Sequence, residues 1–256
     1  MPALFAAGDI HGQYDTFLHL LRSRLLVDAQ GSWTGADAQL WLTGGLLDCR
    51  PQAIPGSLAV LDHVIRLQGQ AAASGGKVVC LLGEQEVLLL AAVPASSPLR
   101  SIWTRCGGRE ADLELFTAAR TAWLVNLPAM EHAGGRLWVH ADALFYTEYG
   151  SDTDEVNAAI ARLLRSPRDP ALERLVEQFG QRNAYNGPDG IERARGFLLR
   201  SGGDQLVHGH TPIHLQTGQP PESVTGPRIY AGGLCVNLDG GLGAGGPGFL
   251  HRFPDI

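Results

Sequence analysis

Short apolar runs that alternate with helical patterns constrain the fold of this chain more than any other feature. Each run is four or five residues long, and most are separated by stretches that carry apolar residues at helical spacing. This alternation is typical of an α/β protein in which parallel strands are buried beneath helices. The runs that we interpret as buried strands are residues 4–7, 40–43, 78–82, 137–140 and 205–208.

The length and apolar content of the chain allow one large core. With 256 residues, 45% of them apolar, the sequence fits a single domain over residues 1–256 better than two small ones. Two helical patterns, at residues 154–164 and 171–179, predict a mostly helical insert around 150–200. Near the carboxyl end, short apolar runs split by glycines predict an antiparallel meander, with strands at 228–231, 234–238 and 249–253.

Chemically active side chains follow almost every apolar run. In an α/β sheet, functional residues gather at the carboxyl ends of the strands, so we expect these side chains to share one site. The prolines and glycines between residues 93 and 108 predict a segment that passes over this site. The candidate site residues are Asp9, His11, Asp48, Arg50, Glu84, His140, Asp142, His208 and His210.

Charge and hydropathy exclude several classes of partner. The net charge is −6 and no block of like charges occurs, so the sequence offers no docking surface for nucleic acid or for an anionic membrane. No apolar run reaches the roughly 18 residues of a membrane helix, and the start lacks a basic leader, so we expect a cytoplasmic protein. Lys77 is the one lysine among the 20 basic residues, which indicates a GC-rich bacterial genome.

The order and spacing of the polar turns resemble the calcineurin-like metallophosphoesterases, in particular the bacterial relatives of the protein serine/threonine phosphatases. The family pattern is Gly-Asp-x-His-Gly, Gly-Asp-x-x-Asp-Arg-Gly, Gly-Asn-His-Glu, a histidine before Ala-Gly, and Gly-His-Thr. The resemblance runs from Asp9 to Asp239. It implies a sandwich of two mixed β-sheets flanked by helices, with two metal ions that share a bridging aspartate and a hydroxide that attacks phosphorus.

Four residues of this chain match the metal ligands that the resemblance implies. Asp9 and His11 correspond to ligands of the first metal, and His140 and His210 to histidines of the second. Asp48 is also retained, at the position that in the family orients the catalytic histidine.

Other positions depart from the family pattern and predict a degenerate active site. Gly45 stands where the bridging aspartate would be, and Glu84 replaces the asparagine ligand. Gln85 replaces the histidine that protonates the leaving group, and glutamine has no proton to give near neutral pH. The phosphate-gripping arginine is displaced, because Cys49 holds its position and Arg50 comes one residue late.

The remaining ligands predict one divalent metal ion, manganese, iron or zinc, or none. Glu84, His140 and His210 form a set of two imidazoles and a carboxylate, which holds an ion better than the two ligands left at the first site. His208 and Asp142 could add a further ligand. The other interpretation of His208 is a hydrogen-bonded wall residue.

Three functions remain open from the sequence. The first is a pseudophosphatase or ligand-binding module that takes a small-molecule or phosphorylated ligand. The second is an enzyme that uses the same pocket for non-phosphatase chemistry. The third is a metal-dependent phosphoesterase with a reduced metal site. For an enzyme, the catalytic candidates are Asp48, Arg50 and Asp142. The substrate and the oligomeric state do not follow from the sequence.

Overall fold

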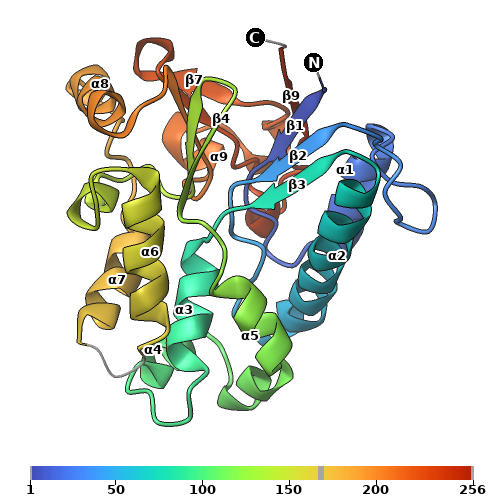
Figure 1. Ribbon diagram of the computed structural model, residues 1–256, viewed down its shortest axis with the longest axis vertical. Coiled ribbons are helices and arrows are strands. Elements are labelled where there is room, and N and C mark those ends of the chain that lie inside the picture. Colours follow the sequence, from blue (N-terminus) through green and yellow to red (C-terminus); the bar gives the residue numbers. More distant parts are fainter. Residues whose placement is uncertain (1, 167–169, 255–256) are drawn as a thin grey trace.

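The computed structural model describes residues 2–166 and 170–254 and shows an α/β sandwich of two mixed β-sheets flanked by helices (Figure 1). This architecture confirms the predicted fold class. The two ends of the chain lie close together, because strand β1 at the amino end pairs with strand β9 at the carboxyl end. Residues 167–169, within the region predicted to be a helical insert, lie outside the described residues.

The first sheet contains the first three predicted strands. Its order is β3-β2-β1-β9, and β1, β2 and β3 run parallel while β9 is antiparallel to β1. The strands are β1 (Leu4–Ala7), β2 (Gln39–Leu42), β3 (Lys77–Cys80) and β9 (His251–Phe253).

The second sheet has a parallel centre and an antiparallel strand at each edge. Its order is β4-β5-β6-β8-β7, in which β5, β6 and β8 run parallel. The strands are β4 (Met130–Ala133), β5 (Arg136–Val139), β6 (Gln205–His208), β7 (Arg228–Tyr230) and β8 (Cys235–Asn237).

Alternate side chains of each strand face two different layers of the core. Trp41 of β2, Trp138 of β5 and Phe253 of β9 belong to the layer between the sheets, where the two indole rings lie 4.8 Å apart between centroids. Leu40 and Leu42, the neighbours of Trp41 in β2, pack into the layer that includes the helices. The period of two that sends successive side chains to opposite faces therefore builds both layers from the same short strands.

Nine α-helices surround the sheets in the described part of the chain (Figure 1). Helices α1 and α2 pack on each other beside the first sheet, and α3 contacts α4, α5, α6 and α7. The helices are α1 (Tyr14–Ser23), α2 (Ile54–Ala73), α3 (Glu84–Ala92), α4 (Arg100–Arg105), α5 (Ala118–Leu124), α6 (Thr153–Leu164), α7 (Ala171–Phe179), α8 (Gly190–Ser201) and α9 (Ile213–Thr217). No helix among the described residues combines the length and the apolar character needed to cross a lipid bilayer.

Two predictions from the sequence are wrong in detail. The three strands of the tail do not form an antiparallel meander, because β8 runs parallel to β6 and β9 joins the other sheet. Strands of three residues carry too little pattern to indicate their partners. The segment that follows α3 is also more than an excursion, since Leu99, Trp103 and Phe116 are buried in the helical core layer.

Candidate metal centre and adjoining pocket

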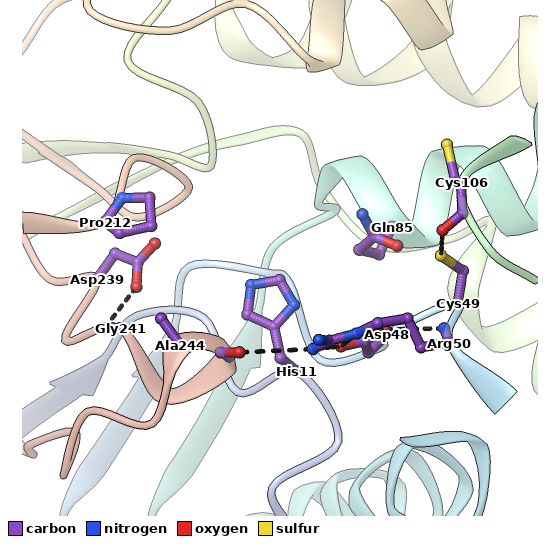
Figure 2. A pocket seen from close by; sticks show the side chains of 11 residues that line it. His11, Asp48, Cys49, Arg50, Gln85, Cys106, Pro212, Asp239, Gly241 and Ala244 are labelled. Carbon is purple, nitrogen blue, oxygen red and sulfur yellow. Dashed lines mark hydrogen bonds and ion pairs between the residues drawn. The ribbon is translucent and has the colours of Figure 1, made fainter. Parts of the chain in front are cut away.

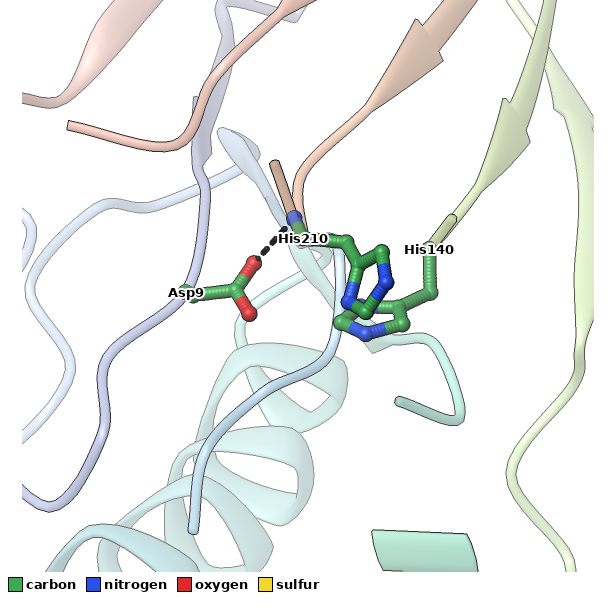
Figure 3. Close-up of side chains that lie close together, drawn as sticks. All are labelled: Asp9, His140 and His210. Atoms are coloured by element: carbon green, nitrogen blue, oxygen red, sulfur yellow. Dashed lines mark hydrogen bonds between the residues drawn. The ribbon is translucent and has the colours of Figure 1, made fainter. Parts of the chain in front are cut away.

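Asp9, His140 and His210 converge where three strands end (Figure 3). They follow β1, β5 and β6, and one ligand atom from each lies within 4.8 Å of the others. All three residues are buried, with exposed fractions of 4%, 0% and 2%. The ends of one strand of the first sheet and two parallel strands of the second thus bring together a carboxylate and two imidazoles that are far apart in the sequence.

The environment of His140 leaves one ring nitrogen available as a ligand. Nδ1 lies 2.8 Å from the carbonyl oxygen of Thr43, and because a carbonyl only accepts, Nδ1 carries the proton and donates. Nε2 is buried and has no hydrogen-bond partner among the described residues. Burial lowers the pKa of His140 to about 3, so the ring is neutral and Nε2 offers a lone pair. Metal-binding histidines are commonly fixed in this way.

His210 presents an even less satisfied ring. Both ring nitrogens are buried and neither meets hydrogen-bond geometry among the described residues, although Nδ1 has the Glu84 carboxylate 3.5 Å away. Burial and, after it, the nearby His140 ring lower the pKa of His210 well below its usual range, which keeps it neutral. Its backbone N–H donates to Asp9 Oδ1 at 2.7 Å. Buried polar atoms without partners are rare in proteins, and a cation between these side chains would satisfy them.

Gly45 leaves the space that the Asp9 carboxylate occupies. A Cβ atom built on Gly45 would lie 2.1 Å from Asp9 Oδ2 and 2.5 Å from Asp9 Cγ. Gly45 also has a φ of 63°, in the left-handed region that favours glycine. Because position 45 has no side chain, the Asp9 carboxylate can occupy the space in which the side chain of a bridging aspartate would begin.

The buried carboxylate of Glu86 holds the turn that carries Gly45. Its Oε2 accepts hydrogen bonds from the backbone N–H groups of Gly45 and Gly83, at 2.9 and 3.0 Å, and its Oε1 accepts one from Leu47 at 3.0 Å. Glu86 stands at the start of α3, so this contact ties the turn after β2 to the helix after β3.

Gly45→Ala is expected to destabilise the protein by about 2 to 5 kcal/mol. A left-handed conformation costs a residue with a Cβ about 1–2 kcal/mol, and overpacking against Asp9 costs about 1–3 kcal/mol more. Chemical denaturation measures this loss. Gly69→Ala is the matched control, because a Cβ there meets nothing within 4 Å inside α2. A Gly45→Ala variant as stable as the wild type would show that Asp9 does not occupy this space.

The candidate metal cluster consists of Asp9, His140 and His210. It differs from the set that the sequence predicts, in which Glu84 is the carboxylate ligand. The Oε2 atom of Glu84 lies 3.1 Å from Nη2 of Arg182 and 3.5 Å from Nδ1 of His210. Glu84 thus forms an ion pair at the edge of the cluster. The sequence-based assignment kept Asp9 with His11 at a separate site. In the structure the Asp9 carboxylate remains near His11 and also lies within 4.8 Å of ligand atoms of His140 and His210.

His11 lies beside the cluster and lines a pocket of about 290 Å³ (Figure 2). Its Nε2 is 3.6 Å from Asp9 Oδ2, and a quarter of its side chain is exposed. Gln85 also faces this pocket. The pocket is lined by His11, Asp48, Cys49, Arg50, Gln85, Cys106, Pro212, Asp239, Gly241, Gly243 and Ala244.

Asp48 and Arg50 form an ion pair on the wall of the pocket. The Arg50 Nε donates to both carboxylate oxygens of Asp48, at 3.0 and 2.9 Å, and the Arg50 backbone N–H donates to Oδ1 at 2.8 Å. Burial alone raises the pKa of Asp48, but the hydrogen bonds from Arg50 outweigh it and leave this pKa below its usual range. An anionic ligand must therefore compete with Asp48 for the Arg50 guanidinium.

His208 has a hydrogen-bond partner at each ring nitrogen and does not line the pocket. Its Nε2 lies 2.8 Å from the Tyr230 hydroxyl and its Nδ1 lies 2.8 Å from the Gly209 carbonyl oxygen. Strand β6 ends at His208 and the backbone turns left-handed at His210, with a φ of 66°. The side-chain alternation of a strand, which would place the His208 and His210 rings on the same side, therefore does not extend to His210.

Asp142 lies behind the cluster and does not line the pocket. It is completely buried, and its two oxygens accept hydrogen bonds from the Asn183 backbone N–H, at 2.9 Å, and from the Thr211 hydroxyl. These contacts place the carboxylate between two loops and not on the wall where a ligand would lie. Its role as a catalytic group stays a prediction from the sequence.

Two charged residues that sequence reasoning missed complete the site. Arg182 donates to Glu84 and to the carbonyl oxygen of His210. It lies outside the strand ends, after α7, so no signal in the sequence indicates it. Asp239 follows β8 and lines the pocket with His11, and burial and, after it, the charge of Asp9 raise its pKa to about 7. The rule that functional residues follow strands could have identified Asp239.

No family model matches the chain, and no curated protein matches it. Among solved structures, a cold-active protein tyrosine phosphatase matches with a TM-score of 0.76 at 19% identity, over 98% of this chain and 73% of that one. The protein tyrosine phosphatase of a psychrophilic Shewanella species matches with 0.74 at 20% identity, over 98% and 75%. A protein serine/threonine phosphatase from Saccharomyces cerevisiae matches with 0.57 at 15% identity, over 93% and 67%.

The TM-scores and coverage show that the fold is shared with these solved phosphatase structures. The resemblance predicted from the polar turns is therefore confirmed for the fold.

Proposed function

We propose that this protein binds one divalent metal ion at Asp9, His140 and His210 and uses it to hold a small phosphorylated ligand, with little or no ordinary phosphatase activity. The observation that carries the proposal is the position of the Asp9 carboxylate over Gly45, beside imidazole nitrogens that lack partners. A phosphatase with two metal ions needs a shared carboxylate between them. Here Asp9 fills that space and faces the histidines.

The donor set suits a single transition-metal ion. Two neutral imidazoles and one carboxylate bind zinc, iron or manganese and leave coordination positions open for water or a ligand. When bound, such an ion polarises a ligand oxygen and lowers the pKa of a bound water. Around it, the protein supplies two guanidinium groups, Arg182 beside the cluster and Arg50 in the pocket. Guanidinium groups match the oxygens of a phosphate group in geometry and charge.

The pocket lacks the groups that an ordinary phosphatase of this fold would use. Gln85 cannot protonate a leaving group. Cys49 is not an alternative nucleophile, because burial raises the pKa of its thiol to about 11 and the thiolate is scarce at neutral pH. The Cys49 thiol donates instead to the Cys106 carbonyl oxygen at 2.8 Å. These features favour ligand binding over hydrolysis.

A metal and phosphate titration tests this proposal. Protein purified without added metal is expected to retain or take up about one zinc or manganese ion per chain, and to bind inorganic phosphate only when loaded. Arg182→Gln should weaken phosphate binding about 10- to 100-fold while metal binding persists, since a charge-assisted hydrogen bond is worth about 1.5–3 kcal/mol. Arg120→Gln, which breaks an ion pair with Asp62 away from the site, is the matched control.

Two results would contradict the proposal. One is a protein that takes up no metal. The other is phosphate binding of equal strength with and without metal. Release of product from a non-phosphate substrate by the loaded protein would instead support the second function that the sequence left open, a repurposed enzyme.

Metal affinity is expected to rise with pH up to about 7 and then level off. Burial raises the pKa of Asp9 to about 7, whereas the pKa of His140 lies at about 3. Asp9 is therefore the ligand that must lose a proton to bind the ion, and below its pKa the Kd should rise about tenfold for each unit of pH lost. Manganese titrations between about pH 5.5 and 8 measure this slope. A Kd that does not change with pH would assign the carboxylate ligand to another residue.

A further inference from the structure

We propose that Asp142 is a positioning residue that fixes Arg182 and His210 relative to each other, so that one buried carboxylate sets both the metal site and the cation beside it. The inference rests on the proposed function, because it assigns a ligand-binding role to both residues. It also makes a separate claim about the two loops that carry them.

Asp142 joins three segments that are distant in the sequence. It lies on the turn after β5, two residues beyond His140, and is completely buried. Its Oδ2 accepts a hydrogen bond from the Asn183 backbone N–H at 2.9 Å, and its Oδ1 accepts one from the Thr211 hydroxyl. Its own carbonyl oxygen accepts a third, from the Ala184 backbone N–H at 2.9 Å.

Two of the residues that donate to the Asp142 carboxylate, Asn183 and Thr211, are direct neighbours of a side chain at the site. Asn183 follows Arg182, and Thr211 follows His210. Asn183 has a φ of 65° and His210 a φ of 66°, so both loops turn through the left-handed region next to the contact. Such conformations persist where the surrounding structure holds them. The Asp142 carboxylate is placed to hold both turns.

A polar network surrounds the carboxylate and leaves it well satisfied. The Gln216 Nε2 donates to Asn183 Oδ1 at 3.1 Å and to Asp142 Oδ2 at 3.4 Å. The Gln216 Oε1 in turn accepts from Arg228 at 2.7 Å and from Asn237 at 2.9 Å. Because buried hydrogen-bond networks act together, the loss of one acceptor is felt on both loops.

Alanine cannot take over this role, because it leaves the Asn183 N–H and the Thr211 hydroxyl without their acceptor. Loss of a hydrogen-bond partner of a metal ligand typically weakens metal binding about 10–100-fold, and Asp142 contacts the neighbours of such groups. We expect Asp142→Ala to weaken manganese binding by at most a factor in this range, and to weaken phosphate binding as well.

The test combines hydrogen exchange with a double-mutant cycle on the whole protein. Hydrogen exchange of residues 181–184 and 209–211 should rise together in Asp142→Ala, without metal and without phosphate. In metal-loaded protein, Asp142→Ala and Arg182→Gln should be non-additive in phosphate affinity, because the first acts in part through the second. Asp112→Ala is the matched control, since Asp112 is a buried carboxylate that accepts two hydrogen bonds from Arg109 and does not line the pocket.

The outcomes separate this inference from the proposed function. Exchange that rises in both loops for Asp142→Ala, and in neither for Asp112→Ala, supports positioning by Asp142. Wild-type exchange in either loop, or a uniform rise over the whole chain, overturns it, as do additive effects on phosphate affinity. If the wild type binds neither manganese nor phosphate, the proposed function fails, and the exchange measurement still decides whether Asp142 holds the loops.

Discussion

Replacing His140 by alanine is expected to weaken metal binding by at least about a hundredfold, more than the loss of an outer hydrogen-bond partner typically costs. His140→Ala removes a neutral imidazole whose Nε2 is buried and without a partner among the described residues, and two ligands remain. Asp9→Ala should cause an equal loss, because the Asp9 carboxylate faces the same cluster. Isothermal titration with zinc or manganese measures both changes.

Two further variants make this comparison decisive. Glu84→Gln should keep most of the metal affinity, since Glu84 is paired with Arg182 at the edge of the cluster. His132→Ala removes an exposed imidazole that contacts the Ser201 carbonyl oxygen and should leave metal binding unchanged. If Glu84→Gln abolishes binding while Asp9→Ala retains it, the ion belongs to the site that the sequence alone predicted.

Hydrolysis of p-nitrophenyl phosphate with manganese is expected to be slower than in an ordinary phosphatase of this fold by at least about 10² to 10⁴, the usual contribution of one positioned proton-transfer group. Gln85 stands where that group would be, and Gly45 stands where the shared carboxylate would be. Steady-state turnover with saturating metal measures the effect. Turnover equal to that of an ordinary phosphatase would contradict the assignment of this pocket to ligand binding.

A repair variant tests the cause of the low turnover. Gly45→Asp combined with Gln85→His returns both groups. However, a side chain at position 45 meets the Asp9 carboxylate 2.1 Å from its Cβ, so activity should recover only if Asp9 moves away. A folded double variant that binds two metal ions and hydrolyses the substrate would show this movement. One that binds a single ion would show that the pocket has diverged beyond these two positions.

The sequence predicted that Asp9, His140 and His210 lie at strand ends, because strand ends are a simple consequence of the α/β alternation. Asp9 and His140 follow strands whose apolar runs are unambiguous, and the structure brings them together. The direction of the Asp9 carboxylate was not predictable, since it depends on the space that Gly45 leaves in three dimensions. A count of the retained ligands therefore favoured Glu84 as the carboxylate ligand. In the structure Glu84 forms an ion pair with Arg182.

Arg182 and the tail show a different limit of the sequence. Arg182 lies after α7, where no strand, spacing or charge run indicates a site, and its contacts with Glu84 and His210 depend on tertiary packing. The partners of β8 and β9 were likewise hidden, because strands of three residues do not specify which sheet they join. Long-range packing decided each of these features.

Anomalous diffraction from crystals soaked in manganese or zinc tests the central claim most directly, because it locates each ion. The account predicts a single peak per chain, in contact with Asp9, His140 and His210. Two peaks that share a ligand would contradict it and would show that a two-metal centre survives without the bridging aspartate. A single peak on Glu84 with no contact to Asp9 would contradict it as well.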